Sequence, residues 1–238
     1  MPGTGIPVER FPLWNSPYFL TNLELELEIL NKIPPAKRNR LKSLALFTRE
    51  KLGGERATPS FIIIGVQKCG TTSLYKNLVK HPNIKAAISK EIRYFDINYK
   101  KGENWYKAHF PILHNSLEWI TGEASPSYSF SYWAPERIQR MLPDVKLIVM
   151  LRNPVRRAYS HYHHSIRYWD ESLSFEDAVG AEEERLQGEF EKIKGDPDYY
   201  SIRYIRYSYL ARGRYVEQLR HWLKFFPAER LKIIRSED

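Results

Sequence analysis

One short segment constrains the fold of this chain more than any other feature of its sequence. Residues 61–75 read FIIIGVQKCGTTSLY, in which an apolar run ends at Gly65 and a loop containing Lys68 leads into a hydroxyl-rich helix start. In a strand–loop–helix unit of this kind, unpaired backbone N–H groups and the positive end of the helix dipole converge at the start of the helix. The segment therefore predicts a buried strand followed by a site for a phosphate-like anion.

The loop departs from the nucleotide-triphosphate signature GxxxxGK[ST]. Gly65 and Gly70 have the spacing of that signature, but Thr71 stands where the lysine belongs, and the lysine comes earlier, at Lys68. We therefore expect a related but different anion.

Apolar strand patterns alternate with helical patterns in the rest of the chain. We expect strands at 61–66, 85–89, 118–123, 146–151 and 231–235, and helices near 71–80, 134–141, 154–167, 174–187 and 214–226. Strands separated by helices imply βαβ crossovers, and hence an α/β fold with a mainly parallel sheet flanked by helices. Ligands of such sheets bind at the carboxyl ends of the strands, where Gly65, Glu123 and Arg152 would emerge.

The first part of the chain has a different composition. Residues 1–57 contain several prolines, a Leu/Glu alternation at 23–28 and a basic helical pattern at 37–52. The alternation fits an edge strand as well as a helix. A length of 238 residues supports one α/β domain plus an extension. We expect an accessory arm over 1–57 and the main domain over 58–238.

The amino-acid composition excludes some classes of protein but does not identify a single class. The net charge of +9 favours anionic ligands, and Cys69, the only cysteine, excludes an internal disulfide. No cluster of Cys and His has structural-zinc spacing, and no apolar run approaches the roughly 18 residues of a membrane span. We expect no membrane span, and a cytoplasmic location, with the Golgi lumen as the alternative if an anchor has been removed.

A second anion motif follows the strand predicted at 146–151. Asn153-Pro154 is a helix-start signal, with Arg152 before it and Ser160 on the helix that follows. The guanidinium and the hydroxyl could close around one phosphate. The alternatives are an arginine that only caps the strand in solvent and a serine that faces water.

Together the two segments resemble a known family. QKCGTTSLY (67–75) and LRNPVRRAYSHY (151–162) resemble the 5′-phosphosulfate loop and the 3′-phosphate motif of sulfotransferases that use 3′-phosphoadenosine 5′-phosphosulfate (PAPS), of the heparan-sulfate type and its bacterial relatives. KEIRYFD (90–96), GENWYKAHFP (102–111), GEASPSY (122–128) and RGRYVEQLRHWLKFFP (212–227) extend the likeness over 59–238. The resemblance implies a P-loop-like three-layer fold. It also implies in-line sulfuryl transfer that leaves 3′-phosphoadenosine 5′-phosphate (PAP) and requires no metal.

The resemblance also implies roles for individual residues. Lys68 would offset the charge that develops on the leaving phosphate. The donor would further be held by loop and helix-start residues and by the second motif: Cys69, Gly70, Thr71, Thr72, Ser73, Arg152 and Ser160, with Arg214 near the adenine. Relatives usually continue beyond the strand at 231–235 with a basic loop over the nucleotide, whereas this sequence stops at Asp238, so either the sequence is truncated or the lid comes from elsewhere.

The acceptor needs a base, and the resemblance favours Glu91, which precedes Ile92. The alternative is a surface glutamate that pairs with Lys90 or Arg93. The rival bases are His109, His161, His163 and His164, of which the last three are expected to pack or contact solvent. Ala124 stands where the glycan enzymes have a lysine. The identity of the acceptor is therefore not fixed: it carries a hydroxyl or an amine and is a small molecule, a glycan or a carrier-bound group.

Two other classes of function fit parts of the sequence. An ATP-dependent phosphotransferase fits the sheet and loop but lacks the lysine at Thr71 and has only Glu123 as a weak magnesium ligand. A non-enzymatic polyanion binder fits the charge and the Arg/Tyr stretch at 199–215. In that stretch we expect the tyrosines to pack and the arginines to face solvent, and the alternative is a groove for an anionic glycan or carrier acceptor. We expect no specific nucleic-acid partner, because that class leaves the paired anion motifs unexplained.

Overall fold

The structure is a computed structural model that describes residues 34–51, 54–113 and 119–237. The chain divides into two compact units, Met1–Thr48 and Arg49–Asp238. The helix expected at 37–52 is present as α2 (Pro35–Lys51). The Leu/Glu alternation at 23–28 lies outside the described residues, and the domain boundary expected after residue 57 stays a prediction.

A parallel sheet forms the centre of the larger unit. Its strands are β1 (Phe61–Gly65), β2 (Ile84–Ala86), β3 (Ile120–Ala124), β4 (Lys146–Leu151) and β5 (Leu231–Arg235). They lie in the order β2-β3-β1-β4-β5, and every pairing is parallel. The predicted strands and the α/β class are thus confirmed, although β2 is shorter than expected.

Helices cover both faces of the sheet because β1 is apolar on both sides. Phe61 and Ile63 pack in one cluster with Tyr75 of α3 (Thr71–Leu78). Ile62 and Ile64 belong to a larger cluster that includes Ile138 of α5 (Ala134–Met141) and Trp222 of α11 (Tyr215–Trp222). The strand's isoleucines are fully buried, which stabilises the sheet by roughly 2 kcal/mol per side chain.

Gly65 fixes where β1 ends. A Cβ atom at this position would lie 2.3 Å from the hydroxyl oxygen of Ser129, in the short turn η3 (Tyr128–Phe130). Only glycine allows this approach, so the loop that follows β1 starts directly against η3.

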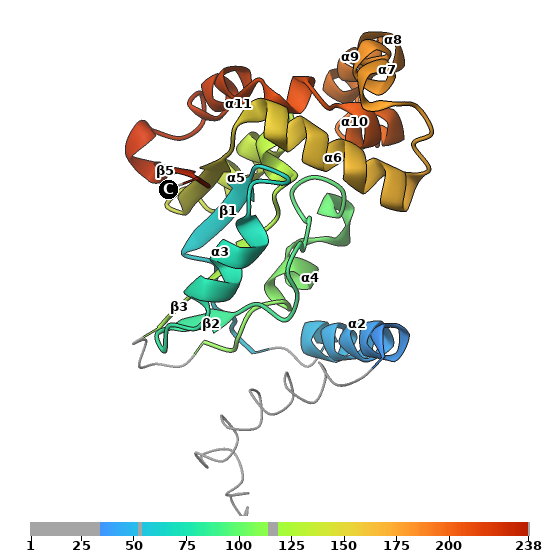
Figure 1. Cartoon of the computed structure of the whole chain (residues 1–238). Coiled ribbons are helices and arrows are strands. Elements are labelled where there is room, and N and C mark those ends of the chain that lie inside the picture. The colour runs from blue at the N-terminus through green and yellow to red at the C-terminus, as the bar shows by residue number, and fades with distance from the viewer. Residues whose placement is uncertain (1–33, 52–53, 114–118, 238) are drawn as a thin grey trace, which may run out of the picture. The chain divides into compact units, whose positions relative to one another are not determined.

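The remaining helices lie mostly after β4. The described chain also contains η2 (Tyr99–Lys101), α4 (Glu103–Lys107), α6 (Pro154–Trp169), α7 (Phe175–Gly180), α8 (Glu182–Leu186), α9 (Glu189–Gly195), α10 (Ile202–Tyr207), η4 (Ala211–Gly213) and η5 (Ala228–Arg230). Figure 1 shows α6 crossing the end of the sheet at which β1 leads into the loop before α3. The carboxyl ends of the strands therefore face α6.

The single helix predicted at 174–187 is wrong, because the segment forms α7 and α8 with a break at Gly180–Ala181. The break turns Glu182 inward, where its carboxylate accepts hydrogen bonds of 2.6 and 2.8 Å from the backbone N–H groups of Leu210 and Ala211. A continuous helix would lose this buried interaction.

Candidate active site

The loop between β1 and α3 presents backbone donors at its end. Lys68 (φ 71°) and Gly70 (φ 88°) both adopt left-handed conformations, which turn the chain sharply into α3. In the part of the chain that the structure describes, no acceptor contacts the backbone N–H groups of Gly70, Thr71 or Thr72. The Ser73 N–H donates to the Gly70 carbonyl. The start of α3 therefore offers free donors and the positive end of its dipole to an anion.

Cys69 supports this loop from the inside. Its side chain is fully buried, its N–H donates to the Val66 carbonyl at 3.1 Å, and its Sγ lies 4.0 Å from the Tyr215 hydroxyl. Burial raises the pKa of the thiol, so it stays protonated near neutral pH. Cys69 was predicted to bind the donor, but neither its thiol nor its N–H faces solvent.

The second anion motif begins where β4 passes into α6. Asn153 caps α6, because its side-chain oxygen accepts from the N–H groups of Val155 and Arg156, which confirms the predicted helix start. Arg152 reaches back to the first loop, where its Nη1 donates to the Lys68 carbonyl at 3.3 Å. Ser160 is half-buried further along α6, and its hydroxyl has no partner among the described residues. The structure thus places the two motifs side by side.

The two basic side chains are close enough to influence each other. Burial lowers the pKa of Lys68, and the charge of Arg152 lowers it further. No carboxylate pairs with either side chain among the described residues. An anion bound between them would relieve this repulsion.

Arg214 borders the same region. It is exposed and directly precedes α11, and a Cβ at the neighbouring Gly213 would lie 3.3 Å from Cβ of Pro154, at the start of α6. Its proposed place near the adenine is compatible with this position, although the structure brings it into no hydrogen bond of the site.

Glu91 lies at the carboxyl end of β3. Its N–H donates to the Ala124 carbonyl at 3.0 Å, and its backbone has a φ of 60°. The carboxylate is half-exposed and lies 2.6 Å from Nζ of Lys90, while Arg93 pairs with Asp96 at 3.0 Å. Glu91 thus lies at the edge of the sheet, as expected for the base, and it also forms the ion pair with Lys90 that was expected for a surface glutamate.

His164 lies within electrostatic range of both Lys68 and Glu91. Burial and the charge of Lys68 lower its pKa, whereas the charge of Glu91 acts in the opposite direction. Packing or solvent contact was expected for this histidine, and it does pack against Trp169. Its place beside Lys68 and Glu91 was missed. The available signal was its spacing of four residues from Ser160, which puts both side chains on one face of α6.

The other histidines lie elsewhere. His109 is buried, donates through Nδ1 to the Trp105 carbonyl, and has its pKa lowered to about 4 by burial. His161 is buried against Tyr209, and His163 is exposed beside Tyr159. These contacts are structural.

Glu123 ends β3 as a buried carboxyl group. It accepts hydrogen bonds from the hydroxyls of Tyr106 at 2.7 Å, Ser125 at 2.8 Å and Tyr128 at 3.3 Å, and burial raises its pKa to about 7. Its oxygens are occupied and shielded from solvent, which removes the magnesium ligand that an ATP-dependent phosphotransferase would need. Among residues 34–51, 54–113 and 119–237, no cluster of His, Cys, Asp and Glu could hold a metal ion.

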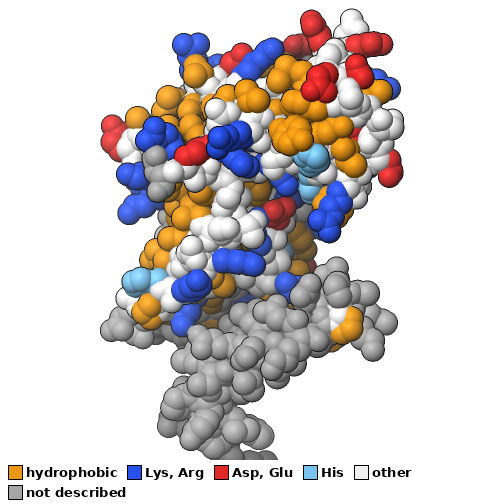
Figure 2. Space-filling view, viewed as in Figure 1, with side chains coloured by type: hydrophobic (Ala, Val, Ile, Leu, Met, Phe, Trp, Pro, Cys, Tyr) orange, Lys and Arg blue, Asp and Glu red, His pale blue; other side chains and the backbone are white. Residues whose placement is uncertain are grey.

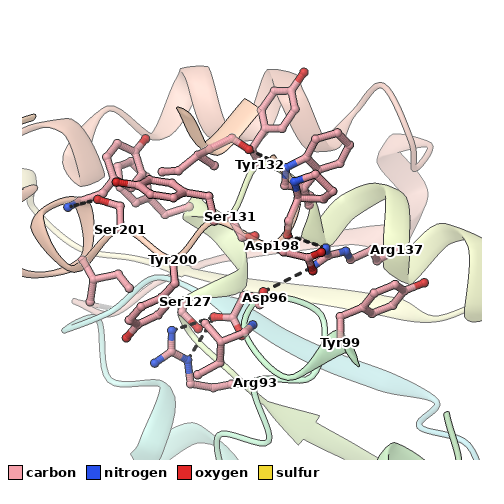
Figure 3. Close-up of a pocket in the computed structure, with 18 of the residues that line it drawn as sticks. Arg93, Asp96, Tyr99, Ser127, Ser131, Tyr132, Arg137, Asp198, Tyr200 and Ser201 are labelled. Carbon is pink, nitrogen blue, oxygen red and sulfur yellow. Dashed lines mark hydrogen bonds and ion pairs between the residues drawn. The ribbon is translucent and has the colours of Figure 1, made fainter. Parts of the chain in front are cut away.

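A cavity of about 310 Å³ is lined by residues that follow Glu91 and Glu123 in the sequence, among them Arg93 and Ser127. Figure 3 shows Arg93 paired with Asp96 at its wall, with Tyr200 and Ser127 nearby. Arg212 also lines it and is only 3% exposed, so the expectation that the arginines of 199–215 face solvent is wrong at this position. The chain turns Arg212 inward because its Nε donates to the buried Ser208 hydroxyl.

Comparison with known proteins identifies the family. The family described as Sulfotransferase domain matches residues 58–238. The chain belongs to the sulfotransferase family. Sulfuryl transfer from PAPS to an acceptor is the activity of this family, and the family predicted from the two motifs is confirmed.

Individual relatives agree with the family assignment. The chain is 34% identical to human heparan sulfate glucosamine 3-O-sulfotransferase 6 over 184 residues, which cover 77% of this chain and 48% of the relative. It is 35% identical to mouse heparan sulfate glucosamine 3-O-sulfotransferase 5 over 182 residues, covering 75% of this chain and 48% of the relative. The chain therefore spans about half the length of these curated sulfotransferases.

A solved structure supports the fold. A sulfotransferase from Alicyclobacillus acidocaldarius superimposes with a TM-score of 0.61 at 34% identity, covering 76% of this chain and 74% of that one. The flanked parallel sheet is therefore the sulfotransferase fold expected from the sequence.

Charged side chains are unevenly distributed over the surface. Figure 2 shows acidic side chains gathered at the top of the view, over the helices α7 to α9, and basic side chains spread over the region of α3 and α6. This distribution favours approach of anions to the anion-binding loops. No helix in the described part of the chain has the length and hydropathy of a membrane span.

Proposed function

We propose that this chain transfers a sulfuryl group from PAPS to a hydroxyl or amine acceptor at the end of its parallel sheet. The observation that carries the proposal is the Arg152–Lys68 contact, which joins two anion-binding motifs at one place. A donor that bears a phosphosulfate and a separate 3′-phosphate needs two such sites, whereas an ordinary nucleotide needs one.

The residues present fit this donor. The unbonded N–H groups at the start of α3 and the side chain of Lys68 suit the phosphosulfate, and the free hydroxyl of Ser160 with the guanidinium of Arg152 suits the 3′-phosphate. PAPS supplies an activated sulfuryl group when bound. Cys69 contributes by holding the loop, and Arg214 is placed to border the adenosine.

Lys68 and Glu91 carry the chemistry in this proposal. The Lys68 ammonium stabilises negative charge on the phosphate side of the bond that breaks, and its half-buried position strengthens that interaction. Glu91 removes the proton of the attacking acceptor group. His164 is the second candidate for this proton, because it lies in the field of both Lys68 and Glu91. Cytoplasmic location and independence of metal ions stay predictions.

Calorimetric titration with PAP tests the donor site. We expect micromolar binding that is weakened at least about tenfold in Lys68→Ala and Arg152→Ala, since each change removes a charged contact. Lys76→Ala, an exposed lysine on α3, and Arg140→Ala, an exposed arginine on α5, are the matched controls. Equal affinity for AMP and PAP would contradict the proposal, because AMP lacks the 3′-phosphate.

A further inference from the structure

The lining of the cavity includes residues that closely follow Glu91, the proposed base, and the end of β3. Arg93 in its wall follows Glu91 by two residues, and its N–H donates to the Ser125 hydroxyl, which in turn donates to Glu123. Ser127, also in the wall, follows the same strand end. The wall residue Arg93 and the proposed base Glu91 are thus both held by hydrogen bonds to the end of β3, at Ser125 and Ala124.

One arginine in the wall has terminal nitrogens without a hydrogen-bond partner among the described residues. Arg212 is 3% exposed, its Nε donates to Ser208, and its Cζ lies 4.6 Å from the centroid of the Phe130 ring. No acceptor among the described residues contacts its terminal nitrogens Nη1 and Nη2. A buried cation without a partner is costly, so this side chain favours an anion that enters the cavity.

The other two arginines of the cavity are already satisfied. Arg93 pairs with Asp96, as Figure 3 shows. Arg137 donates to the carbonyls of Phe95 and Pro197 at 3.1 and 2.8 Å and lies over the Tyr99 ring. Arg212 is thus the wall arginine available to a ligand.

A second unpaired group lies in the same wall. The hydroxyl of Ser127 is buried and has no hydrogen-bond partner among the described residues. Arg212 remains a cation at neutral pH, because burial and the nearby charge of Arg157 lower its pKa only to about 9. The two unbonded terminal nitrogens of Arg212 and the unbonded hydroxyl of Ser127 together form a donor set for a carboxylate or sulfate.

The rest of the wall suits a ring. Aromatic side chains surround the cavity, among them Phe130 and Tyr204, whose rings stack at 4.5 Å, with Tyr132 and Tyr200 shown in Figure 3. A volume of about 310 Å³ lies at the lower end of small-molecule pockets. The space admits one ring with its substituents, and a longer chain would have to extend outside it.

We propose that this cavity binds the acceptor and selects a small hydroxylated ring that bears a carboxylate or sulfate, which Arg212 and Ser127 hold. The inference rests on the proposed sulfotransferase function and deepens it by naming the acceptor class. Both phenolic acids and acidic monosaccharides have this chemistry.

Matched pairs of acceptors test the inference. The pairs are 4-hydroxyphenylacetate with 4-hydroxyphenylacetamide, and methyl β-glucuronide with methyl β-glucoside. With PAPS as donor, we expect the wild type to prefer the acid of at least one pair by about tenfold or more in kcat/KM, because a charged hydrogen bond is lost in the amide or the glucoside. The pair that shows the preference tells whether the ring is phenolic or a sugar.

Two variants and one control locate the preference. Arg212→Gln should reduce it to within about threefold and Ser127→Ala should reduce it partly, while PAP affinity stays unchanged. Ser127→Ala keeps the test valid if the Arg212 variant does not fold, because the hydroxyl of Ser127 makes no hydrogen bond within the described residues. Arg203→Gln, an exposed arginine of the same stretch, should leave the preference intact.

The outcomes separate this inference from the proposed function. The inference alone is overturned if the wild type binds PAP but does not distinguish the acidic from the neutral probes in turnover or in binding. It is also overturned if the wild type binds PAP but neither kind of probe at millimolar concentration. Preference retained in both Arg212→Gln and Ser127→Ala also overturns it. Protein that does not bind PAP overturns the proposed function, and direct titration of the acidic probes, compared between wild type and Arg212→Gln, then decides on the cavity.

Discussion

The hydroxyl of Tyr215 donates a 2.8 Å hydrogen bond to the backbone carbonyl of Arg152. The same oxygen lies 4.0 Å from Sγ of Cys69, so one side chain at the start of α11 contacts both the loop after β1 and the residue that follows β4. Because Arg152 in turn contacts the Lys68 carbonyl, Tyr215 holds the two anion-binding motifs in a fixed relation.

Tyr215→Phe should weaken PAP binding while leaving the fold intact. The ring that packs in the core is kept, and only the contacts of the hydroxyl with Arg152 and Cys69 are lost. Loss of the hydrogen bond to Arg152 corresponds to roughly 1 kcal/mol or about a fivefold rise in Kd. Calorimetric titration measures the change. Tyr159→Phe, an exposed tyrosine on α6, is the control, and an unchanged Kd in Tyr215→Phe would show that the hydroxyl does not position Arg152.

Lys68→Gly should raise stability and abolish transfer. Lys68 has a φ of 71°, a conformation that costs a non-glycine residue about 1 kcal/mol and that glycine adopts freely. Urea denaturation should show a gain of about that size, while activity with PAPS is lost. Asp170→Gly is the matched control, since its φ is 57° at the end of α6, outside the site. It should gain similar stability and keep PAP affinity. A loss of stability in Lys68→Gly would mean that the lysine supports the fold.

The sequence predicts those parts of the structure whose signals are local. The strands have long apolar runs, and the start of α6 has Asn153 and Pro154, so both could be placed from residues alone. Helices α4 and α10 have only five and six residues, which is too short for a helical period to show. The break before Glu182 depends on N–H groups that lie 28 and 29 residues further along the chain, so no local pattern marks it.

The site was predictable to a similar extent. Lys68 and Arg152 follow strands, and parallel strands bring their ends together. Arg212 could not be placed, because an arginine between aromatic residues is usually solvated and only the tertiary contacts with Ser208 and Phe130 bury it. His164 was missed for the same reason: its neighbours Lys68 and Glu91 come from other elements.

Glu91→Gln should lower kcat by about 100-fold or more if Glu91 is the base, with PAP affinity nearly unchanged. His164→Gln should have a smaller effect on kcat at neutral pH. The pKa of His164 is lowered, so an acid limb of the pH–rate profile that depends on it should lie below pH 6.5 and disappear in His164→Gln. Steady-state rates of both variants across this pH range make the distinction. A larger loss in His164→Gln than in Glu91→Gln would assign the proton transfer to the histidine.

Glu123 should make stability fall as pH rises. Its pKa is about 7 in the folded chain and 4.5 in the reference state, so the folded chain holds the extra proton between these values. Stability from this group is therefore full below about pH 4.5 and is lost as pH rises through 7, by about 3 kcal/mol in total. Urea denaturation of the wild type and of Glu123→Gln over this range measures it.

The difference between the two proteins isolates Glu123 from other titrations. His109 contributes with the opposite sign, because its pKa is lowered to about 4 and its stabilisation is lost as pH falls. Since both proteins contain His109, subtracting the Glu123→Gln curve from the wild-type curve removes this contribution. The difference should decline between about pH 4.5 and 7. A flat difference would mean that the three hydroxyl donors stabilise the carboxylate enough to cancel the effect of burial.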